Sequence, residues 1–600
     1  MHRKRSNAEN DVPITGSIRR SGKFSRWNTS FRRRITTACA VVALVSVGTI
    51  VGTTGVASAA TPLPCPTGAS CALGYVPLPS PTRIADTRTV ANGGSASSYN
   101  GDTLAAGTSL AVSAAGAVPS TASAIVVNVT AVNPTNAGFL TVYPTGATLP
   151  TAANIDFTKG QTVGNEVTVG LNGSQSFTVY YGPAGSGTVD FTADVMGYYE
   201  PQATNTGSSF YVPVTPTRIY DSRTIANGGS ASIPGTATTL TNGGSDNVTV
   251  GGVGGVPTFA NGTTAVVLNV AVTNPTAFSF MYAYPTGSTA PLVANQNYTA
   301  GETLSSQVVA TVNSSNQVTI ANHTGNVDIV VDVDGYYTSA GATAGASLLS
   351  TLPTPVRLYD DRNNIPAGTP AGTVAGGNSA VAPVNISTFS SPYTAGAGAD
   401  AYALSIADIA GGGNYLTAYA TGTALPVVAN VNYTGGDAYN VVENAAYAAV
   451  DANGEVSVQN GPATAAGANI VVDEDAYFVS EAHTLTVFAV PGGATSAYPV
   501  SGANSIVGNG TSTADFYVND TADGFVFTGD AIDYSLSGSS ACAANQFVIG
   551  GGAAGLPAGQ TPGFNIVYTS NTAHGTTCIL TVTEPGTSPL VTASATVNQT

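Results

Sequence analysis

All the arginines after residue 60 of this 600-residue chain lie in one short pattern, Arg-x-x-Asp-x-Arg, which occurs three times. The copies begin at Arg83, Arg218 and Arg357, so they start 135 and 139 residues apart. Two guanidinium groups beside one carboxylate suit ion pairing and the binding of anionic groups. The pattern therefore indicates a structural or binding role.

Near the end of each segment, a second signature supplies another aspartate. It runs over residues 194–199, 332–337 and 473–478, and its first two copies end in Gly-Tyr-Tyr. This internal repeat of domain size predicts three successive modules. We expect each pattern to be tied to the last strand of its own module by ion pairs, with either arginine of the pattern as the partner. The predicted ion-pair residues are Arg83, Asp86, Arg88, Asp194, Arg218, Asp221, Arg223, Asp332, Arg357, Asp360, Arg362 and Asp473.

Signatures of common enzymes are missing from the rest of the chain. His323, His483 and His574 are scattered singly, and there is no His-Glu-x-x-His, Gly-x-Ser-x-Gly or Gly-x-x-x-x-Gly-Lys sequence. Paired carboxylates for glycoside hydrolysis stay a formal alternative, but nothing in the sequence fixes the spacing that they need. We therefore expect a protein that is not an enzyme and that uses no cofactor.

The beginning of the chain predicts export. Residues 1–34 are basic, residues 35–56 are apolar and uncharged, and Ala57-Ser58-Ala59 resembles a cleavage site, so residues 1–60 are expected to be a signal peptide. Arg32-Arg33-Arg34 leaves the twin-arginine route open, although the residues that follow fit it poorly. An uncleaved membrane anchor is the alternative. The predicted location is extracellular or at the cell surface.

Charge and composition narrow the class further. Ten of the 17 Lys and Arg residues and two of the 33 Asp and Glu residues precede Thr61, which leaves seven basic and 31 acidic residues. Six of those seven are the repeated arginines and the seventh is Lys159. No basic surface is left for nucleic acid. Glu and Lys are scarce while Val, Thr, Tyr, Gly and Asn abound, which predicts an all-β protein of strands and turns.

The repeats and the change of pattern near Thr484 divide the chain. A lead-in over residues 61–74 precedes module 1 (75–200), module 2 (210–337), the divergent module 3 (348–479) and a last domain (484–600). Residues 124–132 and 265–273 are expected to be buried strands closed by Asn-Pro-Thr turns. The expected fold is tandem β-sandwich-like modules followed by an immunoglobulin-like β-sandwich. The small-residue runs 202–209 and 338–347 are expected to be flexible, exposed linkers.

Three further groups have alternative interpretations. Secretion favours disulfides between Cys65 and Cys71 and between Cys542 and Cys578. The aspartates at 328, 332 and 334 and the acidic run 473–475 are expected to pair with arginines or face solvent, with calcium binding as the less favoured alternative. Tyr198-Tyr199 and Tyr336-Tyr337 are expected to close a sandwich edge, with a sugar-stacking platform as the alternative.

The modules resemble a tandem repeat of secreted actinobacterial proteins. The residues that carry the resemblance are the arginine pattern at 83–88, Val127-Asn-Val-Thr130, Tyr143-Pro-Thr-Gly146 and Asp194-Val-Met-Gly-Tyr198. The resemblance implies all-β modules at the cell surface or in the cell wall and transfers no catalytic residue. Two function classes follow: a structural or adhesive surface protein, or a carbohydrate-binding protein whose partner is cell-wall polysaccharide or a surface glycan. In either case we expect the first two modules to carry the binding.

Overall fold

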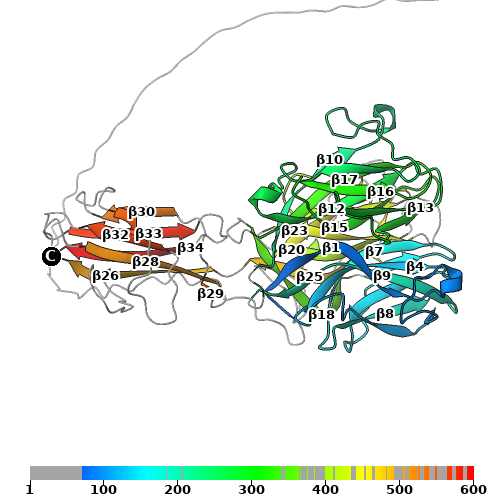
Figure 1. Cartoon of the computed structure of the whole chain (residues 1–600), viewed down its shortest axis with the longest axis horizontal. Coiled ribbons are helices and arrows are strands. Elements are labelled where there is room, and N and C mark those ends of the chain that lie inside the picture. Colours follow the sequence, from blue (N-terminus) through cyan, green and yellow to red (C-terminus); the bar gives the residue numbers. More distant parts are fainter. Residues whose placement is uncertain are drawn as a thin grey trace, which may run out of the picture. The chain divides into compact units, whose positions relative to one another are not determined.

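The computed structural model describes residues 70–480, apart from gaps at 184, 203–204, 206, 340–344, 364, 366–373, 376–383, 386–398, 410–412, 434–440, 452–453 and 462–466. Beyond residue 480 it describes only the backbone of strands between 483 and 599. Nearly all regular structure is β-strand, which confirms the expected all-β, sandwich-like fold (Figure 1). No helix within these ranges is long and apolar enough to cross a membrane.

Module 1 consists of nine strands and one short 3-10 helix. The strands that carry the repeated signatures are its first and its last, β1 and β9. The elements are β1 (Leu73–Asp86), η1 (Val90–Asn92), β2 (Leu104–Ala105), β3 (Ser109–Ser113), β4 (Ala124–Val132), β5 (Gly138–Pro144), β6 (Ile155–Phe157), β7 (Val163–Gly170), β8 (Ser176–Pro183) and β9 (Thr188–Pro201).

Modules 2 and 3 repeat this order. Module 2 contains β10 (Phe210–Asp221), η2 (Ile225–Asn227), β11 (Ser245–Thr249), η3 (Phe259–Asn261), β12 (Thr263–Thr273), β13 (Ser279–Pro285), β14 (Gln296–Tyr298), β15 (Leu304–Thr311), β16 (Gln317–Asn322) and β17 (Asp328–Thr338). Module 3 contains β18 (Ser347–Asp360), β19 (Val384–Asn385), β20 (Ala399–Ile409), β21 (Asn414–Ala420), β22 (Val431–Tyr433), β23 (Val441–Ala449), β24 (Glu455–Asn460) and β25 (Asn469–Ser480).

Each module is a sandwich of two antiparallel sheets. In module 1 the inner sheet has the order β1-β9-β4-β7 and the outer sheet the order β3-β8-β5-β6. Modules 2 and 3 repeat both orders with their own strands, and each module has its own apolar core between its sheets. The Asn-Pro-Thr turns after β4 and β12 place Asn133 and Asn274 at φ 51° and 54°, a left-handed backbone that asparagine tolerates well.

The inner sheets are buried on both faces because the three modules also share a second core. Every residue of β4 and of β17 is buried. On β4, Ile125 and Val127 face the core of module 1, whereas Ala124 and Val126 belong to this second core, which we call the central core. The central core draws on all three modules: Leu73, Tyr75, Ala124, Val126, Met196, Tyr199, Tyr211, Ala265, Val267, Val309, Tyr337, Leu349, Ala401, Ala403, Tyr447, Ala476 and Phe478.

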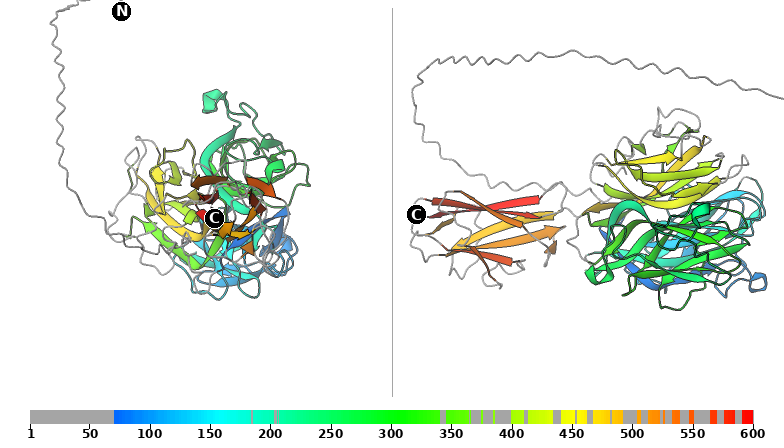
Figure 2. Two further views of the ribbon diagram at one scale, coloured as in Figure 1. Left: turned by 90° about the vertical axis from the view of Figure 1, so that its left-hand side faces the viewer. Right: turned by 90° about the horizontal axis from the view of Figure 1, so that it is seen from above.

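Hydrogen-bonded strands join the modules at this core. Leu73 of β1 pairs with Leu349 of β18, Tyr211 of β10 pairs with Ser347 of β18, and Tyr75 exchanges two hydrogen bonds of 2.8 Å with Ser209. The blue, green and yellow strands of the three modules meet accordingly in Figure 2.

The linker prediction was wrong at its described ends. Ser208, Ser209, Thr338 and Ser347 are at most 3% exposed. They are buried because the chain enters the joined sheets at these points and forms backbone bonds there. The modules therefore form one assembly rather than beads on flexible linkers.

The last domain forms two sheets, of the orders β26-β28-β32-β31 and β27-β34-β33-β30, with β29 paired to β28. The apolar runs at 484–490, 515–518, 525–527 and 578–582 each overlap a strand. The immunoglobulin-like assignment itself stays a prediction. The strands are β26 (His483–Pro491), β27 (Asn504–Ile506), β28 (Thr513–Ala522), β29 (Phe525–Val526), β30 (Asp533–Gly538), β31 (Phe547–Gly550), β32 (Phe564–Thr569), β33 (Thr576–Glu584) and β34 (Val591–Gln599).

Candidate functional site: arginine–aspartate clusters and the module interfaces

The first arginine of each pattern pairs with the last strand of its own module. Antiparallel pairing sets Arg83 opposite Asp194, and the Arg83 Nε lies 2.8 Å from the Asp194 Oδ1. The corresponding distances are 2.8 Å for Arg218 to Asp332 and 2.7 Å for Arg357 to Asp473. Of the two arginines considered for each pair, the structure selects the first.

These pairs are buried unequally. The three aspartate side chains are at most 2% exposed, whereas the three arginine side chains are 15–21% exposed. Burial raises the pKa of Asp194, Asp332 and Asp473, and the hydrogen bonds from their arginines oppose that rise. The carboxylates thus depend on the guanidinium groups for their charge, while each guanidinium keeps contact with solvent.

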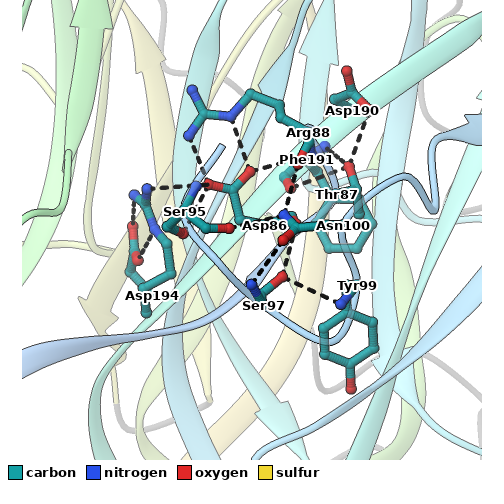
Figure 3. A network of polar contacts seen from close by, with 11 residues as sticks. Asp86, Thr87, Arg88, Ser95, Ser97, Tyr99, Asn100, Asp190, Phe191 and Asp194 are labelled. Carbon is teal, nitrogen blue, oxygen red and sulfur yellow. Dashed lines mark hydrogen bonds and ion pairs between the residues drawn. The ribbon is translucent and has the colours of Figure 1, made fainter. Parts of the chain in front are cut away.

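The second arginine of each pattern binds the aspartate inside the pattern. Arg88 donates to the Asp86 carboxylate from Nε at 2.9 Å and from Nη2 at 2.8 Å, and Ser95 adds its N–H at 2.8 Å and its hydroxyl at 3.0 Å (Figure 3). Burial alone would raise the pKa of Asp86, but these bonds outweigh it and hold the pKa below its ordinary value. Asp86 thereby fixes the turn that follows β1.

Modules 2 and 3 build the same cluster. Arg223 donates to Asp221, and Arg362 donates to Asp360, each from Nε at 2.9 Å. In module 3, Asn363 adds a bond of 2.7 Å to Asp360 and burial is again outweighed, so the pKa of Asp360 is lowered. In every module the repeated carboxylates are therefore engaged by arginine, which suits holding a turn and a strand together.

Asparagines that the sequence analysis did not single out join the modules. Asn128 Nδ2 of module 1 donates to the Ala294 carbonyl of module 2 at 2.6 Å, and Asn269 of module 2 donates to the Ala429 carbonyl of module 3. Between modules 3 and 1, the Ala153 N–H donates to Asp473 at 3.2 Å. The three interfaces thus follow one another in cyclic order.

A second asparagine of each module follows the same order. Asn154 of module 1 donates to Asp475 of module 3 at 3.2 Å, and Asn430 of module 3 donates to Asp334 of module 2 at 3.4 Å. The corresponding bond from Asn295 of module 2 to module 1 is missing. Module 1 has Met196 where the other modules have Asp334 and Asp475, and the Asn295 Nδ2 is buried without a protein hydrogen-bond partner. The sequence signal was the recurrence of Ala-Asn at 153–154, 294–295 and 429–430.

Buried acids also lie between the modules. Glu166 of β7 is 1% exposed and accepts hydrogen bonds from the Val309 N–H at 3.1 Å and from Gln307 Nε2 at 3.2 Å, both in module 2. Burial raises the pKa of Glu166 to about 8. Between modules 1 and 3, burial raises the pKa of Asp156 to about 6, and Asp156 is hydrogen-bonded to Glu443. These interfaces consequently favour protonated carboxyls.

Three of the four paired tyrosines are buried, and the fourth, Tyr198, packs partly buried against the core of module 1, so no pair forms a ring platform at the surface. Tyr199 and Tyr337 are at most 1% exposed, and their hydroxyls are hydrogen-bonded to each other in the central core. The ring of Tyr75 lies 4.2 Å from that of Tyr337 and 5.0 Å from that of Tyr199. They close the junction between modules instead of a sandwich edge.

The central core also explains the glycine of the Gly-Tyr-Tyr signature. A Cβ at Gly197 would overlap the ring of Tyr75, and a Cβ at Gly335 would overlap the ring of Tyr211. In module 3 the smaller Leu349 takes the place of Tyr75 and Tyr211, and Ala476 takes the place of the glycine.

The acidic strand ends are buried rather than facing solvent, and all but Glu474 have a hydrogen-bond partner within the protein; the Glu474 Oε1 is buried without one. Asp328 accepts from Thr239 at 2.7 Å and from Asn274 at 3.2 Å, while Asp332 and Asp334 have the partners described above. Over the described ranges, no group of three or more His, Cys, Asp or Glu side chains could hold a metal ion.

Cys71 is disulfide-bonded. The other predicted disulfide residues, Cys65, Cys542 and Cys578, have no described side chains, so both predicted pairings stay predictions. The signal peptide likewise lies outside the described residues.

Comparison with known proteins gave no match to a family model, to a curated protein or to a solved structure.

Proposed function

We propose that this protein is a secreted, non-enzymatic protein of the cell surface or extracellular space with a structural or adhesive role. The observation that carries the proposal is the central core, because it joins the three modules into one unit. The six repeated arginines, which are nearly all the cations after residue 60, hold turns and strands within that unit. A compact all-β body whose chain is acidic overall after residue 60 suits a spacer or adhesive module outside the cell.

The cyclic arrangement changes how such adhesion would work. Modules on flexible linkers would gain avidity by engaging separate sites independently. Modules fixed around one core present their outer sheets and loops at set positions. Adhesion by this unit therefore depends on ligands that match the fixed positions, or on one module acting alone.

Retention of the full-length secreted protein on actinobacterial cell walls tests the proposal, beside a screen of the same preparation for glycan and peptide hydrolysis. We expect retention that survives washing and no turnover. The same chain after heat denaturation is the control for nonspecific adsorption. Measurable turnover of a glycan or peptide would overturn the non-enzymatic part, and a wholly soluble protein with no retention would overturn the adhesive part.

Carbohydrate binding is the second candidate. The paired tyrosines do not support it, because Tyr199, Tyr336 and Tyr337 are buried. A different observation favours it: the outer sheet of module 2 carries a line of partly exposed aromatic rings, Phe280, Tyr282 and Tyr284.

A further inference from the structure

A row of aromatic side chains follows strand β13 on the outer face of module 2. Phe280, Tyr282 and Tyr284 alternate with the buried residues Met281 and Ala283, so all three rings project from the same face. The ring centroids are 5.8 Å apart between Phe280 and Tyr282 and 5.9 Å apart between Tyr282 and Tyr284. We call these three residues and His323, which stacks on Phe280 at 4.5 Å, the aromatic row.

Modules 1 and 3 lack this row because a threonine holds a loop at the middle position. Thr141 donates to the Ala152 carbonyl and Thr417 donates to the Val428 carbonyl, each at 2.8 Å, and both threonines are buried. Module 2 has Tyr282 at this position and cannot make that bond.

The outer rings are also more open in module 2. Tyr143 and Tyr419, which correspond to Tyr284, are buried, with 7% and 9% of their surface exposed, whereas Tyr284 is partly exposed. Phe278, which directly precedes β13, is 59% exposed. One substitution, Thr to Tyr, thus accompanies a line of three rings along one strand, which neither β5 nor β21 has.

The surroundings of the row are polar and uncharged. Neither β13 nor the neighbouring β16 contains a charged residue. Beside Tyr284, the Thr319 hydroxyl is bonded to Asn247 at 2.7 Å and to Thr286 at 2.9 Å. Asn297, opposite Phe280 in the ladder, is 7% exposed, and its Nδ2 is buried without a protein hydrogen-bond partner.

These features fit the chemistry of one ligand class. Evenly spaced rings along an extended strand can stack on the apolar faces of successive sugars in an extended chain, while amide and hydroxyl groups at their edges bond sugar hydroxyls. The absence of basic residues from β13 and β16, together with the acidic chain, disfavours an anionic polymer. A neutral glycan meets neither a charge penalty nor an unpaired buried charge here.

We propose that the aromatic row binds an uncharged, extended, β-linked polysaccharide by stacking of successive sugar rings on Phe280, Tyr282 and Tyr284. This goes beyond the structural or adhesive role, because the site is defined by module 2 alone and would bind a soluble chain whether or not the protein stays at the cell surface.

The test is affinity electrophoresis of the full chain in gels containing a neutral soluble cellulose derivative or a neutral soluble chitin derivative, with titration of cellohexaose and chitohexaose for affinity. We expect retardation by at least one polymer. Tyr282→Thr, which restores the residue of the other two modules, and Phe280→Ala are each expected to weaken binding by about tenfold, since one stacked ring is lost.

Tyr415→Ala is the matched control, because Tyr415 takes the position of Phe280 in module 3, where no row exists. It should bind like the wild type, and circular dichroism shows whether each variant is folded. No binding of either glycan by the wild type, unchanged binding by folded Tyr282→Thr and Phe280→Ala, or equal weakening by Tyr415→Ala would overturn the proposal. Retardation without retention on cell walls would leave this site standing and count against the adhesive role alone.

Discussion

Removal of Arg218 should cost more stability than removal of its partner Asp332, and the cost should depend on pH. Without the guanidinium, Asp332 remains 2% exposed and must either stay charged in the interior or take up a proton. Protonating a carboxyl with an ordinary pKa near 3.9 costs about 4 kcal/mol at pH 7 and almost nothing at pH 4. Arg218→Met should therefore lower the free energy of unfolding by about 4 kcal/mol at pH 7, within the range known for broken buried pairs, and by about 1 kcal/mol at pH 4.

Substitution of the aspartate leaves an unpaired cation that costs less stability. In Asp332→Asn the guanidinium of Arg218 keeps 21% exposure and lies 3.9 Å from Asp221. The expected loss is about 2 kcal/mol at pH 7, the scale of hydrogen bonds to a charged group. Lys159→Met, which removes an exposed cation outside the patterns, should change stability by less than about 0.5 kcal/mol.

Urea unfolding of the full chain, followed by near-ultraviolet circular dichroism of its tyrosines at pH 7 and pH 4, measures all three variants. Two results would refute the reasoning. If Arg218→Met loses as much at pH 4 as at pH 7, the cost comes from packing of the arginine stem and not from a buried charge. If Asp332→Asn is the more damaging change, the unequal burial of the pair does not govern its energetics.

Three further expectations concern the module interfaces and the last domain. Folded Glu166 keeps its proton up to about pH 8, whereas the unfolded chain releases it near pH 4.5, so the free energy of unfolding of the wild type should fall as pH rises through this window. The stability of Glu166→Gln relative to the wild type should therefore rise by up to about 5 kcal/mol between pH 4.5 and 8. Urea titrations that show no such widening difference between the two proteins would contradict this. Gly335→Ala should destabilise the chain by about 1 to 3 kcal/mol, because the added Cβ overlaps the ring of Tyr211. Adding Tyr211→Leu, which gives the leucine and alanine that module 3 has at these positions, should recover part of the loss in a double-mutant cycle measured by thermal melting. Additive losses would exclude the steric explanation. A Cys542–Cys578 disulfide should leave neither thiol reactive in the denatured, unreduced protein, and mass-spectrometric detection of label at both would disprove the bridge.

Local pattern was enough to predict some of the strands and to predict that the arginine pattern pairs with the last strand of its own module. The expected strand at 124–132 is observed as Ala124–Val132, and the arginine pattern lies opposite the aspartate of its own last strand. Both succeed because alternation and turn residues act over a few positions, and because a repeat that carries one cationic and one anionic signature leaves few ways to pair them.

The sequence by itself determined an all-β chain of three related modules and a fourth domain, with its arginines confined to one pattern. Only the tertiary structure decided what covers the second face of each inner sheet. The alternation of valines and aspartates along β17 suggests that only the valine face is buried. In the structure every residue of β17 is buried, because the neighbouring modules cover the aspartate face. The bonds responsible join residues far apart in the chain, such as Asn154 and Asp475, and no local periodicity encodes such a partner. The same physics hid Tyr199 and Tyr337 in the central core and left the aromatic row of module 2 at the surface.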